Sequence, residues 1–298
     1  MTETATKRGP LHAETDEATG SRWYIHPVTG ERFMSVTTAL KYIAKFGLVD
    51  WSARLAAEAA VSRLPWLARC ARVASCNSAK TADACGACGD CATAWLARRH
   101  IEVRDDAGDR GRRVHEAAEH LELFGEGATV DEDIVEMVDL YRRWRRYYRP
   151  EFEATEMTVI SRKWGYAGTL DSILRFPEDS PLPKKFEHLA GKRIVCDNKT
   201  GKHLGIPEGW QVNAYANADV VLLPDGSEEP MPEVEAGLIL HIRPQTLDAP
   251  AKLQMREVHL SDANQAMFVH LLRVVEGLTG GLGTALSRPT NLPKEAMR

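Results

Sequence analysis

The sequence predicts a mixed α/β fold of the α+β kind, with a mixed central sheet flanked by helices and preceded by an N-terminal helical portion. Apolar residues recur with a helical period through much of residues 48–152 and with a period of two in several segments after residue 153. A helical pattern lies between the later strand patterns, so helices must cover the sheet. The 298 residues, 44% of them hydrophobic, are enough for one sizeable core.

Composition excludes some classes of protein. The formal net charge of −4 gives no overall basic character, so a nucleic-acid partner would need a local positive surface. No run of about 18 apolar residues indicates a membrane span. Residues 1–20 are polar and lack the apolar core of a secretory signal, and we expect a disordered tail there. A cytoplasmic location follows, in which cysteines serve as thiolate ligands or buried thiols rather than disulfides.

The N-terminal helical region is predicted at residues 21–104. It begins with a hairpin around Thr29-Gly30 and a helix capped near Ser35 or Thr37. Helical periodicity follows at residues 48–74, with an interruption at Pro65, and at residues 92–125 and 131–152, which continue into the second part of the chain. Between the first two lies a cysteine-rich insertion, residues 70–91, with no core pattern.

The second part of the chain, residues 105–283, is predicted to contain the sheet. Two strands joined around Trp164-Gly165 come first, within residues 153–176. Further strands are expected at residues 193–201, 235–244 and 251–260, and helices at residues 209–223 and 261–281. The last helix has Ser261 or Asp262 at its start. Residues 284–298 form a weakly patterned C-terminal tail.

The strand at residues 193–201 carries Asp197 and Lys199 two positions apart, so both side chains lie on one face. Asp171 lies on the preceding strand, and adjacent strands bring the two carboxylates close together. Such a pair is costly unless a cation lies between its members, and oxygen ligands suit Mg²⁺ or Mn²⁺. Bound metal lowers the pKa of water and offsets charge on a phosphate oxygen, and Lys199 is placed to orient or deprotonate that water.

Two helical segments carry further candidates at four-residue intervals. Gly111, His115 and Glu119 share one helix face, where the glycine allows a close approach of backbone or substrate. Gln211 and Tyr215 share a face of the helix that follows the Asp197 strand. Each set is also compatible with ordinary packing or surface positions.

Taken in order, these motifs resemble the RecB-like branch of the PD-(D/E)xK nucleases, which includes phage exonucleases and CRISPR-associated iron–sulfur nucleases. The motifs are G-x-x-x-H (111–115), G-x-x-D (168–171), D-x-K with a following T-G (197–201) and Q-x-x-x-Y (211–215). The resemblance covers residues 105–278, and residues 22–40 resemble the opening of phage members.

The resemblance implies a restriction-endonuclease-like core at residues 105–283 with His115, Asp171 and Asp197 as metal ligands. It makes Lys199 the catalytic lysine, while Gln211 and Tyr215 hold the active site and the DNA backbone. At the position of Asp197 the family more often has Glu, and the shorter Asp side chain changes the distance over which it can reach a metal. Glu119 has no firm family counterpart and is expected only to support the site indirectly.

The implied function is a divalent-metal-dependent DNA exonuclease that hydrolyses phosphodiesters by metal-activated water. By resemblance its setting is phage recombination or replication in the host cytoplasm, with a single-strand-annealing protein as partner. Two alternatives stay open: a structure-specific or nicking endonuclease on the same fold, and a non-catalytic DNA-binding module with a metal knuckle. A binding module has no need for the full set of His115, Asp171, Asp197 and Lys199.

The cysteine-rich insertion predicts a second metal. Cys76, Cys85, Cys88 and Cys91 form C-x8-C-x2-C-x2-C in a segment that buries nothing, and thiolates around one ion would order it. Structural zinc is the first candidate, a 4Fe-4S cluster the second, and reduced free thiols the third. Cys70 is a further candidate, whereas Cys196 alternates to the buried side of its strand.

A basic helix lies in residues 141–150, where arginines at 142, 143, 145, 146 and 149 interleave with Trp144, Tyr147 and Tyr148. Two interpretations are open. The arginines form a solvated face with the aromatic rings in the core, or they form a patch that follows DNA phosphates.

Overall fold

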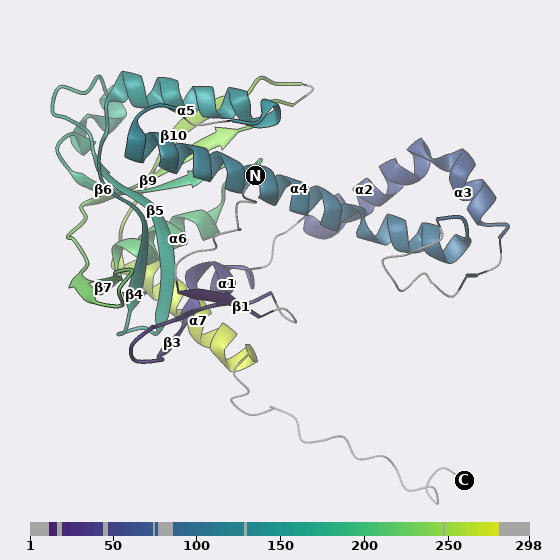
Figure 1. Cartoon of the computed structure of the whole chain (residues 1–298), viewed down its shortest axis with the longest axis horizontal. Coiled ribbons are helices and arrows are strands. Elements are labelled where there is room, and N and C mark those ends of the chain that lie inside the picture. The colour runs from purple at the N-terminus through teal and green to yellow at the C-terminus, as the bar shows by residue number, and fades with distance from the viewer. Residues whose placement is uncertain are drawn as a thin grey trace, which may run out of the picture.

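A computed structural model describes residues 12–16, 20–43, 47–73, 75–76, 86–127, 130–246 and 248–279. A mixed sheet with helices on both faces forms the main body, and a group of helices extends away from it (Figure 1). The predicted mixed α/β class with an N-terminal helical portion is confirmed.

The centre of the sheet is an antiparallel hairpin of β4 (Glu151–Ser161) and β5 (Tyr166–Arg175). It turns at residues 162–165, where Gly165 has φ +79°, a conformation that glycine adopts without steric cost. This is the hairpin predicted around Trp164-Gly165. Beyond β4 lie the short strands β7 (Val220–Leu222) and β8 (Glu228–Pro230).

The other edge of β5 is shared by two strands. The start of β5 pairs in parallel with β3 (Arg32–Ser35), which continues to β2 (Arg22–Ile25) and β1 (Ala13–Thr15). The end of β5 pairs antiparallel with β6 (Arg193–Lys199), which continues to β9 (Ala236–Arg243) and β10 (Lys252–Val258). Residues 168–171 lie outside both ladders, so the sheet divides beside Asp171.

Helices bury apolar side chains against both faces of the sheet. The second half of α4 (Gly89–Phe124) and α5 (Val135–Tyr148) cover one face, with the short 3-10 helices η1 (Glu132–Ile134) and η2 (Lys184–Leu189). Helices α1 (Val36–Leu40), α6 (Ile206–Ala216) and α7 (Asp262–Thr279) cover the other. Burial of each large apolar side chain stabilises the folded state by about 1.5–3 kcal/mol.

The N-terminal helices α2 (Leu48–Ser62) and α3 (Leu64–Cys70) pack on the first half of α4, away from the sheet (Figure 1). Pro65 lies in the first turn of α3, where the predicted interruption falls. The rings of Trp66 and Trp95 meet edge to face, with their centroids 5.3 Å apart. Because α4 runs unbroken from this extension into the main body, residues 104 and 105, the expected domain boundary, fall inside one helix.

Two expectations are wrong in detail. Residues 13–15 of the expected disordered tail form β1, because β2 offers them a free antiparallel edge. The helix expected at residues 209–223 ends at Ala216, and Val220–Leu222 form β7 instead. The Asp219 carboxylate accepts hydrogen bonds from Ser161 Oγ (3.2 Å) and Lys163 N (2.9 Å), which hold the chain beside β4. The prediction for residues 284–298 lies outside the described residues.

Candidate active site

Asp171 and Asp197 come from neighbouring strands at the point where the sheet divides. The ladder between β5 and β6 ends at Ser172 and Cys196, and the two aspartates are the next opposed positions. The backbone N–H of Asn198 donates to Asp171 Oδ2 at 2.6 Å. Asp197 is 1% exposed, so its carboxylate is shielded from water. The expected proximity of the two carboxylates is thus present in the structure.

The Asp197 carboxylate is held by Lys199 of its own strand and by Gln211 of helix α6. The Lys199 ammonium forms an ion pair with Asp197, as the alternation of the strand predicts. Gln211 Nε2 donates to Asp197 Oδ1 at 3.2 Å and to the Tyr215 hydroxyl at 3.0 Å. Tyr215 is 1% exposed, so it positions Gln211 and has no surface with which to contact a DNA backbone. Both members of the Q-x-x-x-Y motif therefore serve the same carboxylate.

The structure shows why the first position of the G-x-x-D motif, Gly168, is a glycine. A Cβ at this residue would lie 2.3 Å from Cε1 of the Tyr215 ring, far inside van der Waals contact. The missing side chain lets α6 approach β5 closely enough for Gln211 to reach Asp197.

His115 lies on helix α4 and contacts Asp171. Its Nδ1 lies 3.2 Å from Asp171 Oδ2. One helical turn earlier, a Cβ on Gly111 would lie 2.7 Å from Thr200 Oγ1, in the turn that follows β6. Because residue 111 is glycine, α4 can pack against this turn and bring His115 to the strands.

Glu156 on β4 is a site residue that the sequence analysis missed. Ligand atoms of His115, Glu156 and Asp171 all lie within 4.8 Å of one another, a grouping that includes no atom of Asp197. Glu156 falls between the paired positions Thr155–Ser172 and Met157–Leu170, and so lies opposite Asp171. Equal counting from the predicted turn at Trp164-Gly165 pairs residue 156 with residue 173, whereas the observed turn at residues 162–165 pairs it with residue 171, so the sequence alone contained no indication of Glu156.

The concentration of acidic groups perturbs their ionisation. Burial and repulsion by Asp171 raise the pKa of Asp197 to about 6, although Lys199 opposes the shift. Lost solvation and repulsion by Asp171 and Glu119 raise the pKa of Glu156 to about 7, even though the residue as a whole is exposed. Burial and the carboxylates of Glu116 and Asp171 raise the pKa of Glu119.

In the His115–Asp171 pair, the pKa shifts of both groups favour their charged forms. Burial lowers the pKa of His115, but the Asp171 carboxylate outweighs it and raises the value to about 9. The same imidazolium, with Lys199, lowers the pKa of Asp171 against the effect of burial. Two carboxylates and an imidazole lie within 4.8 Å of one another, and the Asp197 carboxylate occupies the strand position opposite Asp171. This donor set suits Mg²⁺ or Mn²⁺, so the residues present fit a divalent cation.

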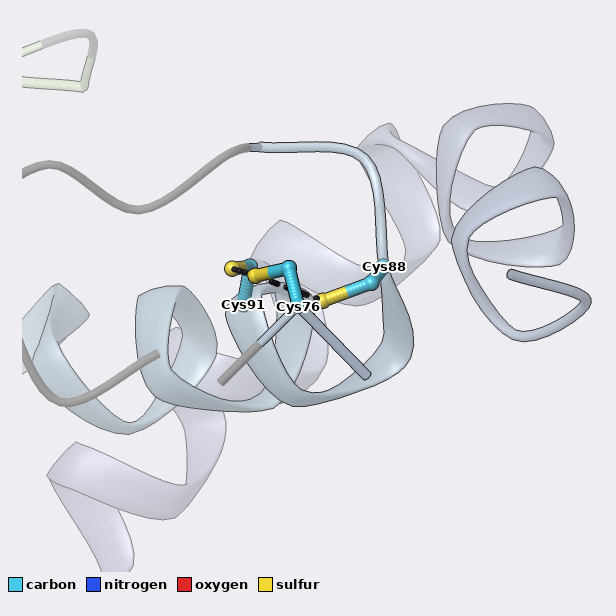
Figure 2. A group of neighbouring side chains, drawn as sticks. All are labelled: Cys76, Cys88 and Cys91. Carbon is cyan, nitrogen blue, oxygen red and sulfur yellow. Dashed lines mark hydrogen bonds between the residues drawn. The ribbon is translucent and has the colours of Figure 1, made fainter. Parts of the chain in front are cut away.

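The predicted cysteine site is present in part (Figure 2). Cys76 Sγ lies 3.4 Å from Cys91 Sγ and 3.5 Å from Cys88 Sγ, and the three sulfurs point toward one another at the start of α4. Backbone amides of Cys91 and Cys76 lower the pKa of Cys88, which favours the thiolate that metals bind. Cys85 lies outside the described residues. Cys70 is buried and donates to Gly86 O at 3.8 Å instead of joining this group.

Comparison with known proteins adds no further assignment: no family model matches the chain, and no curated protein matches it significantly. Among the described helices, none combines the length and apolar character needed to cross a membrane.

Proposed function

We propose that this protein is a divalent-metal-dependent deoxyribonuclease that hydrolyses phosphodiester bonds and acts as an exonuclease. The observation that carries the proposal is the convergence of His115, Asp171, Asp197 and Lys199 from three elements onto one point of the sheet. Four motifs separated by up to 100 residues meet there in the order typical of RecB-like nucleases. A purely structural role would not need an acidic cluster with a partly buried lysine.

His115, Glu156 and Asp171 would hold the cation, with Asp197 beside them. A cation bound there polarises a phosphate oxygen and lowers the pKa of bound water. The protein itself supplies Lys199, whose side chain is 22% exposed while Asp197 fixes its position. Its positive charge is available to stabilise negative charge that develops on a phosphate. Gln211 and Tyr215 are positioning residues, because they keep the Asp197 carboxylate in place.

The finer parts of the proposal rest on the family resemblance. It places the activity in phage recombination or replication, with a single-strand-annealing protein as partner. The cysteine group would hold a structural metal, zinc in the first instance and an iron–sulfur cluster as the alternative. A metal there would join Cys76 to Cys88 and Cys91 at the start of α4, at the far end of the helical extension (Figure 1).

The proposal is tested with end-labelled linear DNA and covalently closed circular DNA of the same sequence, each with Mg²⁺, Mn²⁺ or EDTA. We expect metal-dependent loss of the linear substrate from its ends and an intact circle. D171N should abolish this activity, whereas D106N, which removes an exposed carboxylate from α4, should not. Cleavage of the circle would replace exonuclease by endonuclease. If the protein cleaves neither substrate but binds DNA in EDTA, the non-catalytic DNA-binding module is the remaining interpretation.

A further inference from the structure

A groove of about 860 Å³ lies between α5, η2 and β10, outside the candidate active site. Helix α5 packs against β10, which is the last strand of its branch of the sheet (Figure 1). A smaller depression continues the groove along β10, shares Lys185, Phe186, Gln254 and Met255 with it, and adds Arg256 and Glu257. Together they form an elongated surface, the α5–β10 groove.

The cations of the basic helix divide into two sets. Three arginines are used within the protein: Arg142 pairs with Asp139 (2.8 Å), Arg145 donates to Gly125 O (2.8 Å) and Arg149 pairs with Asp179 (3.0 Å). The other two, Arg143 and Arg146, line the α5–β10 groove, and Arg143 also donates from Nε to Asp139 O at 3.3 Å. The helix therefore carries arginines that pair with acidic residues or bind the backbone of other segments, and two arginines that line the groove.

Positive charge in the groove comes from three elements. Lys185 of η2 and Lys252 of β10 join Arg143 and Arg146, and the lining of the larger depression includes no Asp or Glu. Within the described residues, none of these four side chains has an ion-pair partner. On a chain with net charge −4, four unneutralised cations around one groove form the kind of local positive surface that attracts phosphates.

Aromatic rings lie between these cations. Tyr147 is 61% exposed, and its ring meets the Tyr148 ring edge to face with the ring centroids 4.9 Å apart. Trp144 is 4% exposed and packs beneath. Lys185 lies over the Phe186 ring at 4.6 Å. An exposed ring with Arg and Lys on either side suits single-stranded nucleic acid, since an unpaired base can stack on the ring while phosphates meet the cations.

We propose that the α5–β10 groove is a second nucleic-acid site that binds a single strand, with Arg143, Arg146, Lys185 and Lys252 on the phosphates and Tyr147 against a base. A duplex fits less well, because its base faces are stacked inside the helix and hidden from Tyr147. The site goes beyond the proposed hydrolysis, since no residue of the candidate active site lines the groove.

The test is fluorescence anisotropy of the full-length protein with a dye-labelled oligo-dT of about 20 nucleotides, in EDTA so that no strand is cut. R143Q/R146Q should weaken binding about tenfold and reduce the slope of log Kd against log salt by about 1.4, since each single-strand phosphate contact contributes about 0.7. Y147A should weaken binding about fivefold or more. K163Q/R273Q removes the same charge from a strand turn and from α7, and should bind like the parent.

The two proposals fail separately. Parental oligo-dT affinity and salt slope in R143Q/R146Q would overturn the groove proposal, even if the protein cleaves DNA with metal. A poly-glutamate peptide that competes fully with oligo-dT, together with a Y147A variant that binds normally, would also overturn it in favour of an acidic protein partner. Loss of oligo-dT binding in R143Q/R146Q, with parental binding in K163Q/R273Q, would support the groove even if no nuclease activity were found.

Discussion

Glu156 and Asp171 face each other across the central hairpin where the ladder between β4 and β5 is interrupted. Glu156 has φ +47°, in the left-handed region that residues other than glycine seldom adopt and that costs about 1–3 kcal/mol. The strained residue lies within 4.8 Å, by its ligand atoms, of Asp171 and His115. We infer that this backbone conformation is retained because it delivers a third ligand to the cation site.

The first prediction concerns that ligand. E156Q should weaken Mn²⁺ binding about tenfold or more, because an amide oxygen replaces a charged carboxylate oxygen. Calorimetric titration of Mn²⁺ in the absence of DNA measures the effect. E151Q, which changes an exposed glutamate on the same strand, is the matched control. Equal Mn²⁺ affinity in E156Q and the parent would remove Glu156 from the ligand set.

The second prediction tests the close approach of α6 to β5. G168A should lower the free energy of unfolding by about 1–3 kcal/mol, because the new methyl group overlaps the Tyr215 ring. Urea denaturation gives the value, and G209A, whose Cβ would meet no atom within 4 Å, serves as control. The double variant G168A/Y215A should lose less stability than the sum of the single changes. Additive losses would show that Tyr215 is not the obstacle.

The third prediction is a pH dependence of stability due to Glu122, which accepts a hydrogen bond from the Tyr141 hydroxyl. Burial raises the pKa of Glu122 from 4.5 to about 8. Between these values the folded protein holds a proton that the unfolded chain has released, so stability must fall as pH rises. E122Q should flatten this part of the profile of urea midpoint against pH, whereas E126Q, an exposed neighbour, should not. A profile that E122Q leaves unchanged would contradict the shift.

The fourth prediction concerns the cysteine group. Elemental analysis of the purified protein should find about one tightly held zinc per chain that survives exchange into Mg²⁺. C88S should lose it, while C196A, which alters a buried thiol of β6, should retain it. Iron with acid-labile sulfide in place of zinc would assign a cluster. No metal, with all the thiols of the insertion alkylated in the native protein, would leave free cysteines.

Sequence reasoning found the parts of the site that depend on local periodicity. The alternation of β6 puts Asp197 and Lys199 together, and the four-residue spacing of α4 and α6 places His115 and the Gln211–Tyr215 pair. What it missed depends on tertiary structure. Glu156 joins the site through hairpin register and an unusual φ, and β7 is a strand because β4 offers it an edge. Neither property can be obtained from residue type alone.

The role of Lys199 gives the most direct test of the central claim that this site hydrolyses DNA. K199M removes the ammonium that Asp197 holds but keeps all the candidate metal ligands. Single-turnover cleavage of end-labelled linear DNA at saturating Mn²⁺ should slow about 100-fold or more, with Mn²⁺ affinity unchanged. K163M, which removes an exposed lysine from the β4–β5 turn, should cleave at the parental rate. Cleavage by K199M at the parental rate would contradict the assignment of this site as the nuclease centre.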